Sequence, residues 1–333
     1  MIKYSVIVPV YNRPHEMKEL LDSMAVQTRK DIEIIVVEDG STDRCDHLMS
    51  GYDLNIDYFY KPNTGPGDSR NFGMTKAKGD YLLFFDSDCL LPEDYFEQLD
   101  RGIAHQQPDA FGGPDAAHAS FSDVQKAINY AMTSFLTTGG IRGGKKQLDK
   151  YQPRSFNMGI SKEVYARVGG FSDIHPGEDP DLSFRIMEQG FKVVLIPQAK
   201  VFHKRRIDFS KFLKQVYKFG VVRVILNKWY PATKKTVYFL PSLFFIGVSL
   251  TVLLAVCYRV VFFLPLILYS VLLLVDAIRL GNSLKVSLMA IPAAWIQLLA
   301  YGFGFLKSMW KLHVLGLPER KAFPSFFFDK KKP

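Results

Sequence analysis

Two aspartates, Asp86 and Asp88, stand directly after a strongly apolar stretch of the chain. Residues 80–85, which precede them, have the length and composition of a buried strand. Carboxylates two residues apart at the end of a strand can face one hard divalent cation, and Mg²⁺ and Mn²⁺ are commonly shared with a substrate's phosphates. A solvated turn uses the same residue types. The pair therefore predicts a metal and phosphate site only if other motifs support it.

The elements around this pair predict where such support should come from. Strands are expected at Tyr4–Val10 and at residues 32–37 and 56–60, with short helices between them. This alternation predicts a mostly parallel sheet whose binding crevice lies at the carboxyl ends of the strands. Glu38 and Asp39 follow the second of these strands, so they should reach the same crevice. Arg13 and the loop at residues 65–70 should approach it as well.

The composition separates an α/β part from an apolar part. Of the 333 residues, 48% are hydrophobic and 14% aromatic, which excludes a disordered chain. Residues 1–206 read as one α/β domain, and a strand that begins at Tyr4 leaves no room for a signal peptide before it. The three cysteines show neither disulfide nor zinc spacing, as expected in a reducing compartment. We therefore expect residues 1–206 in the cytosol.

A basic segment follows this domain. Between positions 200 and 235, one acidic residue stands against eleven basic ones: Lys200, Lys204, Arg205, Arg206, Lys211, Lys214, Lys218, Arg223, Lys228, Lys234 and Lys235. Apolar residues interleave with these charges, as in an amphipathic interfacial helix. Residues 207–235 are thus expected to bind anionic headgroups rather than nucleic acid. A merely solvated charged helix remains the alternative.

Three apolar stretches at residues 237–257, 260–275 and 286–306 predict two to three transmembrane helices within 236–309. The second stretch is short unless it continues to residue 280, so it could span with tilt or form a re-entrant hairpin with the first. Three full spans would put the basic tail, residues 310–333, opposite the cytosolic domain, against the positive-inside tendency. Either one segment does not fully cross, or the N-terminal domain overrides the tail.

A glycine-rich stretch at residues 139–146 has too many glycines for a stable helix or strand. It lacks the Lys-Ser/Thr ending of a phosphate-binding loop. A mobile lid and a plain linker are both open interpretations of it.

Four ordered motifs resemble the inverting family-2 glycosyltransferases of the GT-A fold. They are Ser-Val-Ile-Val-Pro-Val-Tyr-Asn at residues 5–12, Val-Glu-Asp-Gly-Ser-Thr-Asp at 37–43, Asp-Ser-Asp at 86–88, and Gly-Glu-Asp with Asp-Leu-Ser-Phe-Arg at 177–185. The resemblance runs over residues 3–223 and implies a Rossmann-like, mostly parallel sheet. The interfacial and transmembrane helices that follow resemble a looser membrane-bound architecture.

On the donor side, the resemblance implies that Asp39 binds the nucleotide base, which suits the N3–H of uracil. A helix-capping role in its turn is the alternative. Pro9 and Tyr11 of the first motif are expected beside the nucleotide. By the same resemblance, Asp88 is the direct ligand of Mn²⁺ or Mg²⁺, and Asp86 reaches the ribose or a metal-bound water.

Two further residues carry open alternatives. Arg70 resembles the nucleotide-side arginine of the family, and a structural ion pair with Asp68 or Asp86 is the alternative. His203 stands where some family members use a histidine on the metal or diphosphate, and a purely structural histidine is equally open.

On the acceptor side, the resemblance implies that Asp179 is the general base that deprotonates an acceptor hydroxyl. A charge–dipole cap of the following helix is the alternative for Glu178-Asp179. Glu178, Asn157 and Met158 are expected to wall the acceptor site, together with residues 168–171.

The resemblance predicts a membrane-bound, metal-dependent, inverting hexosyltransferase that acts on a nucleotide-sugar donor, UDP-linked by preference. Its acceptor is expected to be a lipid-linked saccharide or glycolipid at the cytoplasmic face of the inner (plasma) membrane. A polyprenyl-phosphate glycosyltransferase is the alternative enzyme, and a nucleotide-sugar-binding protein without turnover is a different class. An oligomer is compatible with the sequence. Processive polymer synthesis is not expected, because Lys218 and Phe219 replace the Arg-Trp of the processive motif.

Overall fold

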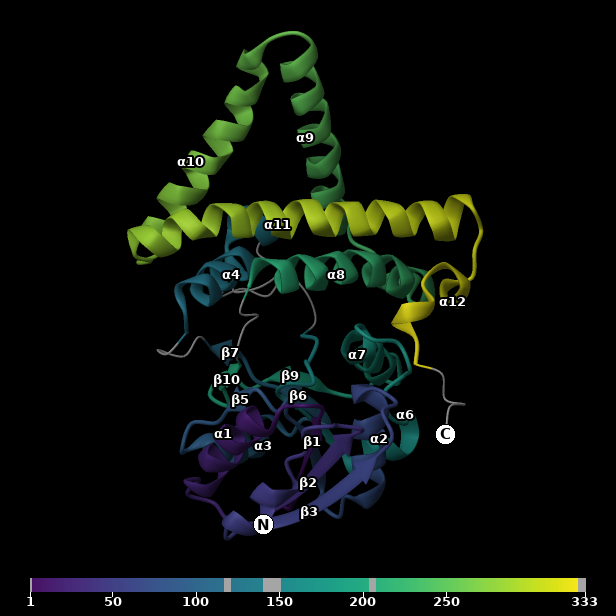
Figure 1. Ribbon diagram of the computed structural model, residues 1–333. Coiled ribbons are helices and arrows are strands. Elements are labelled where there is room, and N and C mark those ends of the chain that lie inside the picture. The colour runs from purple at the N-terminus through teal and green to yellow at the C-terminus, as the bar shows by residue number, and fades with distance from the viewer. Residues whose placement is uncertain (1, 117–120, 140–150, 204–207, 329–333) are drawn as a thin grey trace. The chain divides into compact units, whose positions relative to one another are not determined.

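The computed structural model describes residues 2–116, 121–139, 151–203 and 208–328 (Figure 1). The chain forms two compact units. The first consists of Met1–His118, Lys150–Lys204 and Ser325–Pro333, and the second of Ala119–Asp149 and Arg205–Pro324. Both ends of the chain therefore belong to the first unit.

A seven-stranded sheet is the centre of the first unit. Its strand order is β3-β2-β1-β4-β8-β6-β9, and its pairs are parallel except where β8 meets β4 and β6. In order along the sheet, the strands are Asn55–Lys61, Ile32–Asp39, Tyr4–Val10, Tyr81–Phe84, Met158–Ser161, Ala110–Gly112 and Val193–Leu195. A second sheet joins β5 (Cys89–Leu90), β10 (Val201–His203) and β7 (Asp115–Ala116).

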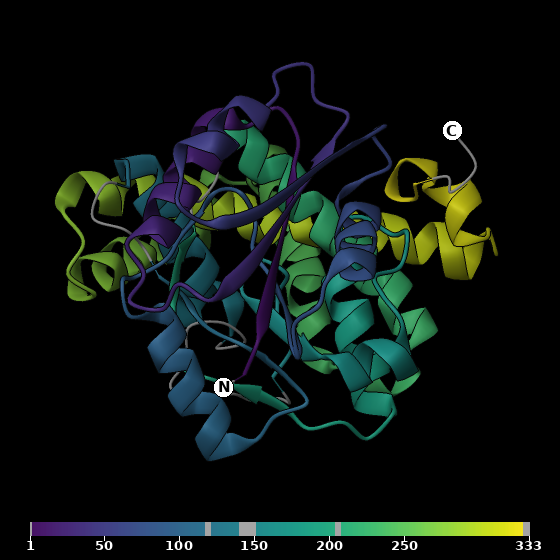
Figure 2. The ribbon, with the colours of Figure 1, turned by 90° about the horizontal axis from the view of Figure 1, so that it is seen from below.

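Helices cover both faces of the large sheet (Figure 2). On one face, α1 (Pro14–Ala25) and α3 (Tyr95–Gln106) share a buried core with the strands. On the other face, the core contains residues of α2 (Pro66–Lys76), α6 (Lys162–Val168) and α7 (Glu178–Glu188). A strand buried on both faces tends to be a continuous apolar run, as β2 is from Ile34 to Val37. The predicted α/β class with a mostly parallel sheet is confirmed.

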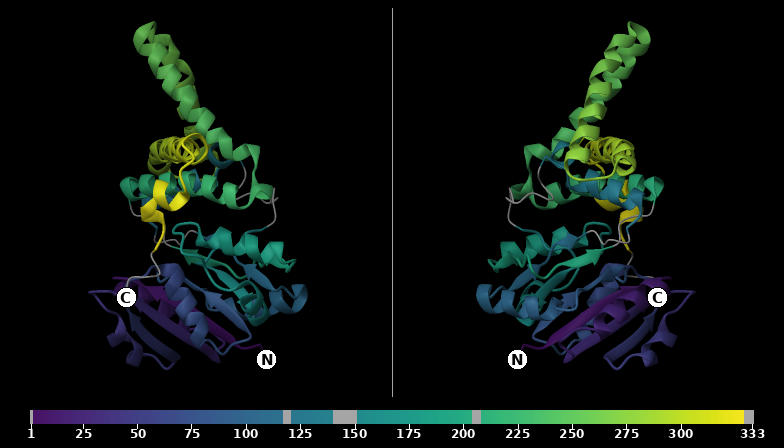
Figure 3. Two further views of the ribbon diagram at one scale, coloured as in Figure 1. Left: turned by 90° about the vertical axis from the view of Figure 1, so that its right-hand side faces the viewer. Right: turned by 90° about the vertical axis from the view of Figure 1, so that its left-hand side faces the viewer.

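The second unit consists of helices. They are α4 (Asp123–Thr133), α5 (Phe135–Thr138), α8 (Phe209–Trp229), α9 (Leu240–Cys257), α10 (Leu264–Arg279), α11 (Leu284–Met309) and the short α12 (Glu319–Ala322). Within this unit α8 and α11 run side by side, and α9 and α10 form a hairpin that projects from them (Figures 1 and 3).

Glycines allow the helices of the second unit to approach closely. A Cβ on Gly220 of α8 would lie 2.2 Å from the Tyr301 carbonyl oxygen, and one on Gly304 of α11 would lie 2.4 Å from the Tyr217 carbonyl oxygen. At Gly302 it would lie 2.2 Å from the Pro241 carbonyl oxygen. Backbone-to-backbone approach at these positions is therefore possible only without a side chain.

Helix α4 belongs to the second unit although it precedes half of the large sheet in sequence. Its Ala127 and Tyr130 are buried with Leu273 and Ala277 of α10, and the Tyr130 hydroxyl donates to Asp276 at 2.7 Å. The sequence-based boundaries at residues 206, 235 and 309 stay predictions, because grouping by contacts does not establish which segments fold independently.

Within the part of the chain that the structure describes, three helical segments are long and apolar enough to cross a membrane: Thr236–Cys257, Val260–Arg279 and Leu284–Val314. They differ in burial. The most apolar part of each of the first two is 11% buried, against 44% for the third, because α11 packs against α8 and α4. The third segment thus has fewer surfaces left for lipid.

The close glycine contact at Gly304 makes a first testable prediction. Gly304→Ala forces a Cβ against the Tyr217 carbonyl, whereas a Cβ on Gly247 of α9 meets none of the described residues within 4 Å. We expect Gly304→Ala to lower stability by about 1–3 kcal/mol through overpacking. Gly247→Ala, the matched control, should slightly raise it through helix propensity. Thermal unfolding in detergent micelles measures both, and equal midpoints would contradict the contact.

Candidate functional site

The loops after β1 and β2 are joined by Asn12. Its backbone has a positive φ of 52°, and its side-chain oxygen accepts from the amides of Thr42 at 2.8 Å and Asp43 at 3.0 Å. Tyr11 beside it is 52% exposed, and Pro9 is partly buried at the end of β1. The two predicted nucleotide-side residues thus lie at the carboxyl end of the sheet, in a loop that the β2 turn holds in place.

Asp39 is held by donors from the β3–α2 connection. Its carboxylate accepts from the amides of Thr64 at 3.0 Å and Gly65 at 2.9 Å, and from Lys61 Nζ at 2.6 Å. Gly65, which has a positive φ of 96°, is the N-cap residue of α2. The carboxylate therefore organises the turn into α2, and its predicted contact with a nucleotide base stays a prediction. Neighbouring Glu38 is buried and accepts from the Cys45 amide at 2.9 Å.

Asp88 lies between two cationic or protonatable side chains. Its Oδ2 is 2.6 Å from Arg13 Nη1, and its Oδ1 is 3.2 Å from His203 Nε2. The His203 ring stacks on Phe156 with centroids 4.7 Å apart. Although burial opposes it, His203 and Arg13 hold the pKa of Asp88 well below its usual range. Asp88 is therefore an anion at neutral pH.

The predicted metal residues meet at this point. His203 Nε2 lies 3.2 Å from Asp88 and 3.9 Å from Asp86 Oδ2. Asp88 Oδ1 is buried and faces the His203 ring. Cys89 Sγ belongs to the same cluster, but burial raises the pKa of its thiol well above the usual value, so it stays protonated. The carboxylate oxygens of Asp86 and Asp88 fit Mn²⁺ or Mg²⁺.

Arg70 is buried at the centre of the site. Its Nη2 is 2.6 Å from Asp86 Oδ1 and its Nη1 is 3.6 Å from Glu178 Oε1. The sequence left two ion pairs open for Arg70, one with Asp86 and one with Asp68. The structure has the pair with Asp86, whereas Asp68 pairs with Lys61, whose Nζ lies 3.3 Å away. Burial opposes the charge, but the surrounding carboxylates outweigh it and raise the pKa of Arg70. A nucleotide contact of Arg70 stays a prediction.

Asp179 lies in the first turn of α7, whose N-cap residue is Gly177. Its Oδ1 is buried, and no described residue donates a hydrogen bond to it. Helix capping by a side-chain hydrogen bond is absent at this N-terminus as described, so only the charge–dipole part of the capping alternative remains. Burial, reinforced by the charge of Glu178, raises the pKa of Asp179 to about 6.

Glu178 has the opposite electrostatics. Its Oε1 lies 2.9 Å from His175 Nδ1. Burial alone would raise its pKa, but His175 and Arg70 lower the pKa of Glu178 to about 2. The pair thus divides its roles: Glu178 is a permanent anion, whereas Asp179 can take up a proton near neutral pH.

The C-terminal aromatic run packs beside these loops in the first unit. Phe327 forms a β-bridge with Ile174, and the Phe326 carbonyl accepts from the His175 amide at 2.7 Å. The Phe328 ring lies against Gly65, and its centroid is 6.1 Å from that of the His175 ring. This segment therefore supports both the Asp39 turn and the partner of Glu178.

Asn157 and Met158 lie beneath the site rather than on its surface. Each is 1% exposed. The Asn157 side chain accepts from the Tyr95 hydroxyl at 2.6 Å and donates to the Ala199 carbonyl at 2.8 Å, and Met158 lies in β8 within the core. In these positions they pack beneath the residues that line the site. Their predicted contact with an acceptor stays a prediction.

Lys61, His175 and Phe328 are site residues that the sequence analysis did not identify. The spacing of His175 three residues before Glu178 and the Phe-Phe-Phe run in a basic tail are the signals that could have indicated two of them. Lys61 had none. Of the predicted features, most of the glycine-rich stretch (residues 140–146) and the basic residues Lys204, Arg205 and Arg206 lie outside the described residues.

Comparison with known proteins agrees with this geometry. Residues 5–165 match the family model described as glycosyl transferase family 2. The chain is 30% identical over 245 residues to the glycosyltransferase GlyA of Streptococcus pneumoniae serotype 4, covering 73% of this chain and 30% of that protein. It is 45% identical over 97 residues to an uncharacterized glycosyltransferase of Rickettsia felis, covering 28% and 16%.

A similar solved structure is the mannosyltransferase PcManGT from Pyrobaculum calidifontis, in complex with GDP-mannose and Mn²⁺. It matches with a TM-score of 0.56 and 16% identity, over 92% of this chain and 87% of that one. This likeness concerns the fold. The chain spans less than a third of the length of the two curated relatives. With its ordered motifs and its sheet, the chain carries a glycosyl transferase family 2 domain of GT-A-like fold.

Proposed function

We propose that this protein is a membrane-bound, inverting glycosyltransferase that transfers a hexosyl group from a nucleotide diphosphate sugar. The acceptor is a lipid-linked saccharide or glycolipid at the cytoplasmic face of the inner membrane. The observation that carries the proposal is the buried Oδ1 of Asp179, whose carboxyl has a raised pKa, next to Glu178 and the Arg70–Asp86 pair. The Arg70 guanidinium thereby links Asp86 of the donor side to Glu178, the neighbour of the general base in sequence.

On the donor side, Asp88, Asp86 and His203 would hold the divalent cation. When bound, this cation neutralises the diphosphate and stabilises it as the leaving group. Arg13 and Arg70 already balance the two aspartates electrostatically. A UDP-linked donor is favoured because the Asp39 carboxylate can accept from the N3–H of uracil. PcManGT is in complex with GDP-mannose, so a GDP-linked donor is the alternative to screen.

On the acceptor side, Asp179 Oδ1 accepts the proton of the attacking hydroxyl. The hydroxyl oxygen forms a bond to the anomeric carbon on the face opposite the diphosphate. The bond from that carbon to the diphosphate oxygen breaks, and its electron pair leaves with the diphosphate. One displacement inverts the anomeric centre. A polyprenyl phosphate acceptor is already ionised and needs little base assistance, so the raised proton affinity of Asp179 supports a hydroxyl acceptor.

The place to which the chain returns supports one membrane topology over the others. Ser325–Pro333 belongs to the first unit, together with the N-terminal strands, and Phe327 is bonded there through its β-bridge to Ile174. A segment that leaves one water-soluble unit and returns to it crosses a membrane an even number of times. This supports the alternative in which one apolar segment does not cross.

We assign the crossing to the α9–α10 hairpin. Its helices are the two least buried of the three apolar segments, and the 18 residues of α9 extend about 27 Å, close to the ~30 Å hydrocarbon core. Tyr258 and Arg259 at its tip would reach the far interface. Helix α11, packed along α8, then lies at the near interface, and the basic residues of α8 favour the cytosol for that side.

The topology can be tested with cysteine reporters. In a Cys257→Ser background, Arg259→Cys places a thiol at the hairpin tip and Arg320→Cys places one in α12, while native Cys45 and Cys89 are buried. We expect a membrane-impermeant maleimide to label these two positions from opposite sides of oriented vesicles. The intact catalytic activity of each variant serves as the folding control. Labelling of both positions from one side would contradict the spanning hairpin.

The donor-side cluster predicts metal dependence. Asp88→Ala removes the carboxylate between Arg13 and His203 and should lower turnover by about 10³-fold, the loss typical of a charge-stabilising group. Asp53→Ala, at an exposed position outside the site, is the control. Release of UDP or GDP from a panel of nucleotide sugars, with membrane lipid extract as acceptor, measures both. Full activity in excess EDTA would remove the cation from the proposal.

The electrostatics of Asp179 predict the pH profile. A base with its pKa raised to about 6 is protonated below that pH, so kcat should rise through about pH 6 and level off above it. Glu178→Gln removes an anion that raises the pKa of Asp179 and should shift this limb to lower pH. Asp179→Asn should bind donor normally but transfer about 10²–10⁴-fold more slowly.

Two outcomes would contradict this assignment. Transfer by Asp179→Asn at the wild-type rate would reduce the residue to its charge–dipole role in α7, or would favour the phosphate acceptor. A product with the anomeric configuration of the donor, determined by NMR, would exclude a single inverting displacement.

A further inference from the structure

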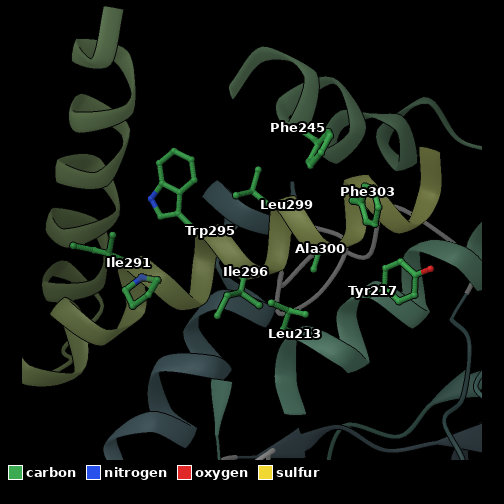
Figure 4. A pocket seen from close by; sticks show the side chains of 10 residues that line it. Leu213, Tyr217, Phe245, Ile291, Trp295, Ile296, Leu299, Ala300 and Phe303 are labelled. Carbon is green, nitrogen blue, oxygen red and sulfur yellow. The ribbon is translucent and has the colours of Figure 1, made fainter. Parts of the chain in front are cut away.

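An apolar groove of about 670 Å³ lies within the second unit, between α8, α9 and α11 (Figure 4). This volume is in the range of small-molecule sites. The side chains that converge on it come from all three helices: Leu213, Tyr217, Phe245, Ile291, Pro292, Trp295, Ile296, Leu299, Ala300 and Phe303. Helix α11 supplies its floor.

The groove exists because the helix backbones are close at one end and held apart at the other. Gly302 and Gly304 let α11 approach α9 and α8 closely. Towards the N-terminus of α11, large side chains take the place of glycine. There the Trp295 ring packs 5.4 Å from Phe244 of α9 and donates from Nε1 to Ser270 Oγ of α10 at 3.1 Å. The indole is therefore fixed as a wall and its polar atom is already used.

The groove is open as well as apolar. Leu213 and Phe303 on its rim are each 47% exposed, and its lining offers a ligand almost no polar atom besides the Tyr217 hydroxyl. Exposed apolar walls of this kind need an apolar occupant. A polar sugar or nucleotide would lose its hydrogen bonds to water without replacement. A hydrocarbon chain makes no hydrogen bonds to water, so its burial in the groove has no such cost.

A basic side chain stands at the Tyr217 end of the groove. Lys307 Nζ of α11 lies 5.7 Å from the centre of the Tyr217 ring, and Lys214 and Lys218 are exposed on the same helix as Tyr217. This charge complements an anionic headgroup whose chain enters the groove. An apolar groove with a basic end should therefore bind an anionic lipid more tightly than a neutral lipid.

We propose that this groove binds the hydrocarbon chain of the anionic lipid that carries the acceptor, with its phosphate at Lys307. The proposal rests on the proposed function, since a lipid-linked acceptor is assumed. In the hairpin topology, α8 and α11 lie at the membrane interface, so a chain can enter from the bilayer while its headgroup stays at the aqueous surface. The groove would then select the acceptor lipid.

Binding is tested without turnover by photolabelling. The full-length protein, in phosphatidylcholine vesicles, is irradiated with a polyprenyl phosphate that carries a diazirine in its chain. We expect label on the peptide that contains residues 291–303, and loss of label with excess unlabelled polyprenyl phosphate. Leu299→Trp fills the groove and should reduce the label. Leu288→Trp, on the exposed face of the same helix, should keep it.

Turnover provides the second readout. The ratio of kcat/KM for a long-chain acceptor to that for a short-chain, water-soluble analogue should fall roughly tenfold in Leu299→Trp, as when two methylenes leave an apolar site. Leu288→Trp should keep the wild-type ratio. Labelling that phosphatidylglycerol abolishes equally well, or equal ratios in both variants, would make this a bulk-lipid surface and overturn the proposal. Specific labelling without any glycosyl transfer would instead refute the proposed function alone.

Discussion

The buried guanidinium of Arg70 is the constraint on which the site depends. A buried cation is tolerated only with close anionic partners, and here they come from separate elements: Asp86 after β4 and Glu178 at the start of α7. The ring of Phe171 packs 5.3 Å from the guanidinium carbon and closes the remaining side. The ends of β4, α2 and α7 are thereby brought to one place, although more than 100 residues separate Arg70 from Glu178 in sequence.

In this arrangement the carboxylate of Asp179 differs from the other carboxylates of the site in its partners. Asp39 and Asp88 have cations at 2.6 Å, Asp86 pairs with Arg70, and Glu178 is shared by Arg70 and His175. Asp179 lies in the same cluster without such a partner among the described residues for its buried Oδ1. Because its neighbour Glu178 takes the favourable contacts, Asp179 carries the electrostatic cost of both burial and repulsion. A raised proton affinity at one chosen carboxylate is what general base catalysis requires.

Local sequence patterns predicted the first four strands of the chain, but not β6 or β8, which are only three and four residues long. Buried strands are apolar runs that end in polar turns, so Asp39, Asp86 and Asp88 could be assigned to one edge before the structure was known. Contacts between distant segments leave no such pattern. Neither the support of Gly65 by Phe328 nor the grouping of α4 with α10 has a local signature. Hydropathy could likewise identify α11 as apolar, but not that α8 covers it.

The chain returns to the first unit after the apolar helices. Residues 325–328 follow the helices α8 to α12 in the chain. They contact the loops that carry Gly65 and His175. The β-bridge at Ile174 fixes the register of this contact, so the length of chain available to α9, α10 and α11 is bounded at both ends by one folded unit. A third crossing would leave residues 325–328 on the wrong side of the membrane and the turn at Gly65 uncovered. Under the proposed topology, two crossings keep Phe326, Phe327 and Phe328 on the side of the donor loop, and α11, which packs along α8, is the apolar helix that does not cross.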